Sequence, residues 1–437
     1  MDRRDFLRTG LALGGAALTS TTGCATTPAS APQATAAPPP ADSWEAFRGE
    51  FDLSRDDIHL SHFLLTPHHR SVREAIEMYR KAFDTHPLKA FRQFATAEAE
   101  VARAAAAYLE VKPEELALTD STTMGLGLVY AGLRLREGEE ILTTTQEHYA
   151  TDQSLTLRAE RTGALVRRVS FYTDPEALTE EAAVQSLLRT ITPRTRYIAL
   201  TWVYSVSGVK YPVRALADAL AKVNEGRSEE ERILLCVDGV HGLGVEVETI
   251  PQLGCDFFIS GCHKWMFGPR GTGFIWGKPS AWKRLVPNIP TFYSPAVRIW
   301  AKDDPPSAQP PGPMVTPGGF HSFEHRWALN KAFELHQRLG RERVTARVHE
   351  LNRYTKQEMA KMPHVRVRTP LSDSLSAGLT CFEVVGLDPA EVVKRLAEKR
   401  IITTVSHYVT RYVRVSPGLL NTHEDVDALL RELRAMS

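Results

Sequence analysis

Lys264 is the residue of this sequence best placed for covalent chemistry. It lies in a glycine-rich turn between two short apolar segments, Phe257–Ile259 and Thr272–Trp276, which have the composition of buried strands. Burial disfavours a charged ammonium and lowers the pKa of a lysine, and the neutral amine is the nucleophile that forms imines with carbonyl compounds. The alternative is a solvent-exposed lysine in an ordinary turn, so other parts of the chain must decide between the two.

Four further predicted strands are each followed by polar groups that could serve the same chemistry. These are Ser121, Thr122 and Thr123 after Leu116–Thr119, His148 after Ile141–Thr145, Ser205 after Arg196–Val203, and Asp238 and His241 after Ile233–Val237. Ligands of open α/β sheets bind at the carboxyl ends of strands, so the strand-end position of His148 favours a function for it over an ordinary loop histidine. The three hydroxyl residues also precede a predicted apolar helix, Met124–Leu133, whose free N–H groups and dipole would attract an anion. Plain helix capping is the other interpretation of these hydroxyls.

Together these residues resemble the cofactor site of class V aminotransferases. This group of fold-type I pyridoxal 5'-phosphate (PLP) enzymes includes cysteine desulfurases, kynureninases and isopenicillin N epimerase. An Asp-x-x-His pattern at residues 238–241, followed by His263, Lys264 and a Gly-Pro-Arg-Gly turn, carries most of the resemblance. It extends from about Trp44 to the C-terminus and is strongest to the isopenicillin N epimerase-like branch.

The resemblance implies a role in binding PLP for each candidate residue. Lys264 would hold the cofactor through an imine, and Asp238 would pair with the pyridine nitrogen, whose protonation makes the ring an electron sink. The other assignments are Ser121, Thr122 and Thr123 to the phosphate, His148 to the ring face, and Ser205 and His241 to the 3-oxygen. His263 and Ser260 are both candidates for a further phosphate contact. Arg414 would bind the substrate α-carboxylate through two parallel hydrogen bonds, unless it is an exposed strand arginine.

Two stretches depart from the family pattern. Pro317–Arg326 occupies the region that crosses to the phosphate of the partner subunit in the family, but it lacks the usual Gly-Thr pair, so no residue is assigned there. Ile401–Arg411 lies where desulfurases carry their nucleophilic cysteine, and this segment has no cysteine. We therefore do not expect a persulfide-forming desulfurase, and we expect His407 and Tyr408 to shape the substrate pocket.

Strands alternate with helical stretches between Leu116 and Trp276, which predicts an α/β fold. The resemblance implies a mainly parallel seven-stranded sheet in a large PLP-binding domain, residues 44–326, and a small C-terminal α/β domain, residues 327–437. We predict that the strongly helical stretch Trp327–Leu351 joins the two domains, and that Tyr293 and Trp300 line the substrate pocket. A homodimer is also implied, because the cofactor site of the family lies at the subunit boundary.

The composition is that of an ordinary globular enzyme. The 437 residues are 43% hydrophobic and 24% charged, and the net charge of +1 comes without a long basic segment, so nothing favours binding to nucleic acid. We assign no metal site. Of the five cysteines, the four beyond Cys24 adjoin apolar or glycine-rich segments, which favours buried free thiols over disulfides.

Residues 1–24 resemble an export signal rather than part of the fold. Asp2–Arg8 resembles a twin-arginine motif, the apolar Leu11–Leu18 is too short to span a bilayer, and Thr21–Cys24 partly resembles a lipobox. We expect export by the twin-arginine route to the periplasm, with a lipid on Cys24 that anchors the protein to a membrane. An ordinary cleaved signal and an uncleaved anchor are the alternatives. The Pro- and Ala-rich residues 25–43 would form an extended tether.

These observations predict a PLP-dependent enzyme that acts on the α-carbon of an amino acid, with Lys264 as the base. Returning the proton to the cofactor carbon gives transamination, and returning it to the opposite face of the α-carbon gives epimerisation. Loss of a β-substituent gives a lyase. We favour an aminotransferase or epimerase. The alternatives are a PLP-dependent C–S or β-lyase and a non-catalytic periplasmic binding protein with a PLP fold.

Overall fold

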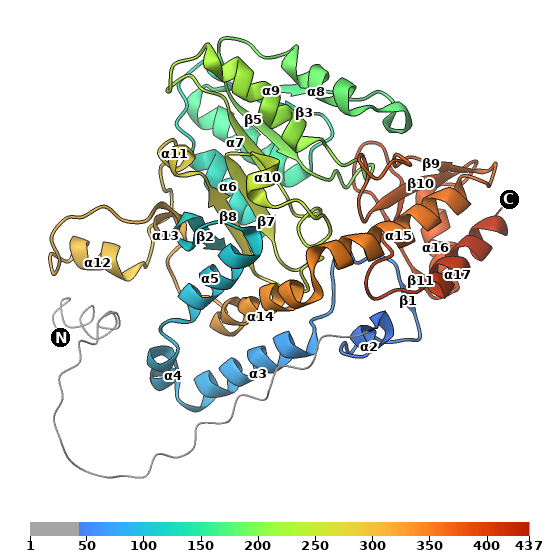
Figure 1. The fold of residues 1–437 in the computed structure, drawn as a ribbon, viewed down its shortest axis with the longest axis horizontal. Coiled ribbons are helices and arrows are strands. Elements are labelled where there is room, and N and C mark those ends of the chain that lie inside the picture. Colours follow the sequence, from blue (N-terminus) through green and yellow to red (C-terminus); the bar gives the residue numbers. More distant parts are fainter. Residues whose placement is uncertain (1–42, 437) are drawn as a thin grey trace.

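The computed structural model describes residues 43–436 of the chain. They form a large α/β body around one sheet and a smaller α/β unit built from C-terminal residues (Figure 1). The predicted export signal, Cys24 and nearly all of the predicted tether lie outside the described residues. Within 43–436, no helix is both long enough and apolar enough to cross a lipid bilayer.

The large body is organised by a seven-stranded sheet. Its strand order is β2 (Leu116–Thr119), β8 (Gly273–Gly277), β7 (Phe257–Gly261), β6 (Leu234–Asp238), β5 (Thr195–Thr201), β3 (Glu140–Thr144) and β4 (Leu165–Val169). Neighbouring strands pair in parallel except at β8, which is antiparallel to both β2 and β7. The predicted mainly parallel, seven-stranded sheet is confirmed.

Both faces of this sheet are covered, which explains why its strands are apolar throughout rather than alternating. Along β5, Tyr197 and Ala199 enter one hydrophobic core, whereas Ile198 and Leu200 enter the core on the other face. Helices α6 (Thr122–Gly132) and α7 (Tyr149–Thr162) cover the first face, and α5 (Ala97–Leu109) and α9 (Val213–Glu225) cover the second. The other helices of this body are α3 (Arg70–Thr85), α4 (Pro87–Gln93), α8 (Glu180–Leu188), α10 (Ile250–Leu253), α11 (Pro279–Trp282), α12 (Ser294–Trp300) and α13 (Pro311–Val315).

The stretch predicted to be helical and to join the domains is helical except at one break, which divides it into two helices. Helix α14 (Phe323–Leu339) ends at Gly340, whose φ of 80° lies in the left-handed region, and α15 (Arg341–Met359) begins after it. Glycine adopts that conformation without the steric cost that other residues incur. Figure 1 shows the two helices running from the large body to the C-terminal unit. Helix α14 packs on α3 and α5, whereas α15 contributes Leu351 and Met359 to the core of the C-terminal unit.

The C-terminal unit has a four-stranded antiparallel sheet of its own. The strand order is β12 (Thr404–Val405), β13 (Val413–Val415), β10 (Thr380–Val384) and β9 (Val365–Val367), with helices α16 (Pro389–Glu398) and α17 (His423–Arg434). Near the start of the described chain, α2 (Trp44–Arg48) is followed by β1 (Ile58–His59). Strand β1 pairs in parallel with β11 (Ile401–Ile402), so the first strand of the chain belongs to the C-terminal unit.

Candidate active site

A cavity of about 210 Å³ opens at the carboxyl ends of β3, β5 and β6 and at the start of α6. Nine residues predicted from the sequence line it: Ser121, Thr122, Thr123, His148, Ser205, Asp238, His241, His263 and Lys264. They come from five separate segments of the chain. The parallel strands bring these segments together, because their carboxyl ends meet at one edge of the sheet.

Lys264 lies directly beyond β7, in a turn that fixes its backbone. Its carbonyl oxygen accepts hydrogen bonds from Thr66 Oγ1 at 2.7 Å and from the Phe267 N–H at 2.9 Å. The half-buried side chain faces the cavity, and Nζ lies 3.2 Å from His241 Nε2. Burial lowers the pKa of Lys264 to about 8, although Asp238 acts in the opposite direction. The amine is therefore available in both its neutral and its charged form near neutral pH.

Asp238 ends β6 as a buried carboxyl group with few partners. Its Oδ1 accepts a hydrogen bond from the Val240 N–H at 3.1 Å. Burial raises its pKa to about 6, although the Val240 hydrogen bond and the charge of Lys264 act in the opposite direction. Within residues 43–436, no cationic side chain forms an ion pair with it at 4 Å or less. A buried carboxylate in this condition needs a cation from outside the protein.

The start of α6 joins the hydroxyl residues to the lysine segment. Ser121 is the N-cap, and its Oγ accepts a hydrogen bond from the Met124 N–H at 3.1 Å. Thr122 Oγ1 accepts a hydrogen bond from the Gly261 N–H at 2.8 Å. A Cβ at position 261 would lie 2.9 Å from that same oxygen, so the close approach requires glycine there. Ser121 thus caps the helix, while the first N–H groups of α6 have no intrahelical partner and are free to bind an anion.

Three aromatic or histidine side chains border the space between these groups. His148 is the N-cap of α7, its Nδ1 accepts from the Ala150 N–H at 3.1 Å, and burial together with the charge of Lys264 lowers its pKa. Burial and Lys264 also hold the pKa of His241 well below its usual range, and its Nδ1 has no partner within the described chain. Tyr408 reaches the cavity from the loop between β12 and β13, and its hydroxyl lies 2.7 Å from Ser205 Oγ.

Arg414 lies on β13 close behind the cavity rather than in its lining. Its Nε donates to Thr404 Oγ1 at 3.2 Å, Nη1 to the Ser205 carbonyl at 3.2 Å, and Nη2 to the Val405 carbonyl at 2.9 Å. The guanidinium also stacks over the Phe63 ring. A guanidinium has five N–H groups, so one on each Nη is left for another acceptor. It is buried, and the alternative of an exposed strand arginine is wrong.

Several expectations from the sequence do not match the cavity. Ser260 is fully buried and its hydroxyl donates to the Gly261 carbonyl, so of the two candidates for an extra phosphate contact only His263 lines the cavity. Tyr293 and Trp300 do not line it, and Trp300 is 67% exposed. The segment that carries α12 projects from the body instead of folding over the site (Figure 1). The prediction that both side chains form the pocket wall is wrong for this chain taken alone.

The sequence interpretation missed Glu147 as a structural group of the site. Its carboxyl accepts hydrogen bonds from the hydroxyls of Thr144, Thr201 and Tyr204 at 2.7–2.9 Å, and burial raises its pKa to about 7. The signal was present, because a glutamate directly before His148 at a strand end is a charged group at a buried position.

The four described cysteines, Cys236, Cys255, Cys262 and Cys381, are buried free thiols, and no group of three or more metal-ligating side chains occurs within 43–436.

Comparison with known proteins places this architecture in a family. The family model described as "Aminotransferase class-V" matches residues 66–429. Isopenicillin N epimerase of Streptomyces clavuligerus is 28% identical over 410 residues, which cover 90% of this chain and 98% of the relative. A probable cysteine desulfurase of Xylella fastidiosa (strain Temecula1) is 25% identical over 421 residues, 91% of this chain and 96% of the relative.

Solved structures agree with the fold. A mutant of C-DES with glycine covalently linked to the PLP cofactor superposes with a TM-score of 0.78 at 20% identity, covering 89% of this chain and 98% of that chain. The apo cysteine desulfurase of Thermococcus onnurineus NA1 gives a TM-score of 0.75 at 21% identity, covering 90% and 97%. The protein therefore belongs to the class V aminotransferase family of fold-type I, PLP-dependent enzymes.

Proposed function

We propose that this protein is a PLP-dependent enzyme that acts on the α-carbon of an amino acid, as an aminotransferase or an epimerase. The observation that carries the proposal is the pairing of a half-buried lysine with a buried, uncompensated carboxyl group across one cavity. Lys264 and Asp238 both have pKa values displaced toward neutrality by burial. Such displaced values cluster at catalytic sites, where charge is kept for a ligand instead of being neutralised by the protein.

The groups around the cavity fit PLP on three points of this structure. Asp238 lacks a cation and would gain one from a protonated pyridine nitrogen. The buried Nδ1 of His241 lacks a hydrogen-bond partner, and Ser205 presents a hydroxyl to the same cavity. The start of α6 offers N–H groups to a phosphate, with Thr122 held in place by its bond to the Gly261 N–H. The site thus has a complementary group for the nitrogen, the oxygen and the phosphate of the cofactor.

Bound PLP supplies an electron sink that acidifies the α-proton of an amino acid attached to it. Lys264 Nζ then takes that proton, and a pKa near 8 lets the same amine both accept and return it. His241 Nε2, 3.2 Å from Nζ, keeps the amine pointed into the cavity. The two remaining N–H groups of Arg414 are suited to a substrate carboxylate, because they lie on the two Nη atoms of one planar group. Tyr408 and His148 line the same space.

The first experiment is an absorbance spectrum of the purified mature protein between about 300 and 500 nm, followed by the addition of single amino acids. A cofactor band that is lost in Lys264→Ala establishes covalent binding at this lysine. Release of a keto acid then identifies transamination, and exchange of the α-proton with racemised substrate identifies epimerisation. Release of a β-substituent identifies a lyase and would replace our assignment. A protein that shows no band even with added PLP would be a binding protein without this chemistry.

We also propose that the enzyme is exported and works as a homodimer, on separate support. The twin-arginine pattern at Asp2–Arg8 and the partial lipobox at Cys24 support export and lipid attachment. The large apolar side chains of Phe292, Trp300 and Phe320 are exposed in the single chain, and burial of such groups in a subunit interface would support association of two copies. Cell fractionation with mass spectrometry of the mature N-terminus tests the first point, and sedimentation analysis tests the second.

A further inference from the structure

Arg326 is the buried member of a charged cluster beside the start of α6, whose two carboxylates, Glu98 and Asp120, are 42% and 41% exposed. It lies in the first turn of α14, and its side chain is only 4% exposed. Its Nη2 donates to Asp120 Oδ1 at 2.7 Å, and Nη1 lies 3.4 Å from Glu98 Oε1. His321 Nε2 lies 3.2 Å from the same glutamate oxygen. A buried guanidinium is costly to desolvate, so it is held here by two carboxylates.

The position of Asp120 connects this cluster to the cavity. Asp120 directly precedes Ser121, the N-cap of the helix whose first N–H groups face the cavity. An unpaired carboxylate at that place would repel a second anion bound at the helix start, because like charges at short range repel each other. Arg326 removes this repulsion, since it places a positive charge within hydrogen-bonding distance of Asp120.

The same turn of α14 also touches the lysine side of the cavity. His325 Nδ1 lies 3.0 Å from the carbonyl oxygen of Arg270, in the loop that follows Lys264. Further along the helix, Leu329 packs so close to Gly268 that a Cβ there would lie 3.0 Å from Leu329 Cδ1. The start of α14 thus contacts the residue before the α6 N-cap through Arg326 and the loop that follows Lys264 through His325.

We propose that Arg326 is a positioning residue for the phosphate of the bound cofactor. It neutralises Asp120 and fixes the α6 N-terminus, so that the N–H groups of this helix attract a dianion. The inference rests on the proposed function, since it assumes that PLP occupies the cavity. It also gives a function to Pro317–Arg326, the stretch in which the sequence offered no phosphate ligand.

The test compares two ligands that share a ring and differ in the phosphate, PLP and pyridoxal. Both are titrated into apo-protein, and binding is followed by absorbance and tryptophan fluorescence without any turnover. In Arg326→Met we expect the Kd for PLP to rise about ten- to a hundredfold, while the Kd for pyridoxal changes by less than about twofold. Arg326→Lys keeps the charge and should retain most of the PLP affinity.

A second substitution separates charge from structure. If Arg326 acts by neutralising Asp120, the double variant Arg326→Met/Asp120→Asn should recover most of the lost PLP affinity. Arg196→Met is the matched control. Arg196 is also a buried arginine, with Nε 2.8 Å from Glu139, but it lies near the first residue of β5, at the opposite end of the strand from the cavity residue Thr201. This control should change neither Kd.

Three results would overturn the inference. Equal loss of PLP and pyridoxal binding in Arg326→Met would assign a purely structural role, and unchanged PLP binding would assign none. Failure of Asp120→Asn to restore PLP binding would remove the electrostatic argument. If Arg326→Met does not fold, the single variant Asp120→Asn becomes the test. Its PLP affinity should equal or exceed that of the wild type, and a lower affinity contradicts the inference. A wild-type protein that binds neither ligand rejects the proposed function instead.

Discussion

Two lysines of this molecule are taken out of bulk water, and their surroundings differ. Lys264 faces the cavity, and within residues 43–436 its Nζ has one side-chain hydrogen-bond neighbour, His241 Nε2 at 3.2 Å. Lys356 on α15 is 1% exposed, and its ammonium donates to the carbonyls of Pro370 and Leu371 at 2.8 and 3.2 Å and to Ser376 Oγ. Burial lowers the pKa of each to about 8. A shifted pKa therefore does not identify a catalytic lysine.

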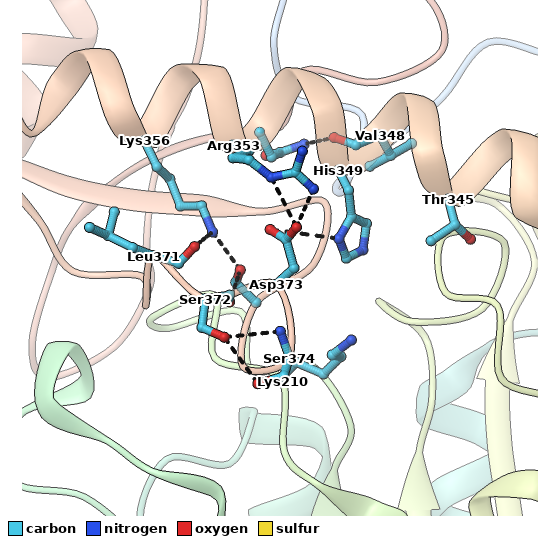
Figure 2. Close-up of polar contacts among 12 residues, drawn as sticks. Lys210, Thr345, Val348, His349, Arg353, Lys356, Leu371, Ser372, Asp373 and Ser374 are labelled. Carbon is cyan, nitrogen blue, oxygen red and sulfur yellow. Dashed lines mark hydrogen bonds and ion pairs between the residues drawn. The ribbon is translucent and has the colours of Figure 1, made fainter.

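The number of satisfied donors distinguishes the two sites. An ammonium has three N–H groups, and Lys356 uses all three within the protein, whereas Lys264 keeps donors directed at a cavity. Figure 2 shows Lys356, Arg353 and His349 pointing from α15 toward the loop around Asp373. Nearby, Lys210 of the large body pairs with Glu246 at 2.6 Å, and His349 Nε2 lies 2.7 Å from the same carboxyl group. We call this region, where α15 and the Asp373 loop meet Lys210 and Glu246 of the large body, the domain junction. Its charged side chains are paired with other groups of the protein, whereas Lys264 and Asp238 of the active site remain available to a ligand.

The largest expected effect of this difference is in catalysis. Lys264→Ala should abolish the cofactor absorbance band and lower turnover by about a thousandfold or more, because it removes both the attachment point and the base. Lys356→Met should keep the band and most of the turnover. Spectra and initial rates measured on the two variants side by side test this. Retained turnover in Lys264→Ala would contradict the assignment of the two lysines.

The next largest effect is on stability, and here substitution of Lys356 should cost more than substitution of Lys264. Lys356→Met should lower the free energy of unfolding by about 3 kcal/mol, because three oxygen acceptors, two of them buried, lose their donor. Denaturant midpoints at constant slope measure it. Lys361→Met is the control, since Lys361 is exposed and pairs only with Glu358, one turn earlier. A loss in Lys356→Met no greater than in this control would show that the oxygen cage contributes little.

The pH dependence of cofactor binding tests whether Asp238 is a carboxyl group kept for a ligand. Burial raises the pKa of Asp238 to about 6, so the carboxylate needed to pair with the pyridine nitrogen is present above pH 6 and is lost as the pH falls below it. PLP affinity should therefore fall by up to about tenfold per pH unit below 6. Asp238→Asn should bind PLP more weakly at pH 8 and without this dependence. A flat wild-type profile between pH 5 and 8, measured as Kd, would contradict the assignment.

The smallest expected effect lies at the rim of the domain junction. Asp373→Asn breaks an ion pair with Arg353, but these side chains are 34% and 49% exposed, so water and salt screen their attraction. The free energy of unfolding should fall by less than about 1 kcal/mol, and turnover should not change. The measurement is the denaturant midpoint at low and high salt. A loss of unfolding free energy comparable with that of Lys356→Met would show that the Asp373–Arg353 pair is not screened by water and salt.

The sequence predicted those site residues that lie at the end of a recognisable strand or at the start of a recognisable helix. Apolar runs predicted the strands of the central sheet, and the family resemblance assigned Asp238, His148 and Lys264 to one site. The structure brings the three together because the carboxyl ends of parallel strands meet at one sheet edge. The break at Gly340 was missed, because the helical pattern continues on both sides of it. The depth of Arg414 was not predictable, since carbonyls from distant segments bury it.

The structural lysine had a signal in the sequence that was not used. Asn352, Thr355, Lys356 and Met359 recur at helical spacing, and all four are buried on one face of α15. A lysine in such a face must meet acceptors, but the acceptors come from the loop around Leu371, which only the tertiary fold brings near. Periodicity therefore indicates that such a residue is buried, and it cannot name its partners.

The pairing of β1 with β11 has a consequence for how the chain is made. Ile58 pairs with Ile401 and His59 with Ile402, so this strand has no partner until nearly the whole chain has left the ribosome. Contacts of such long sequence separation form slowly, because much chain entropy must be lost before they are gained. This part of the fold therefore forms only after residues 401 and 402 have left the ribosome, and protease resistance of residues 43–60 in nascent chains of increasing length would report the moment when β1 and β11 pair.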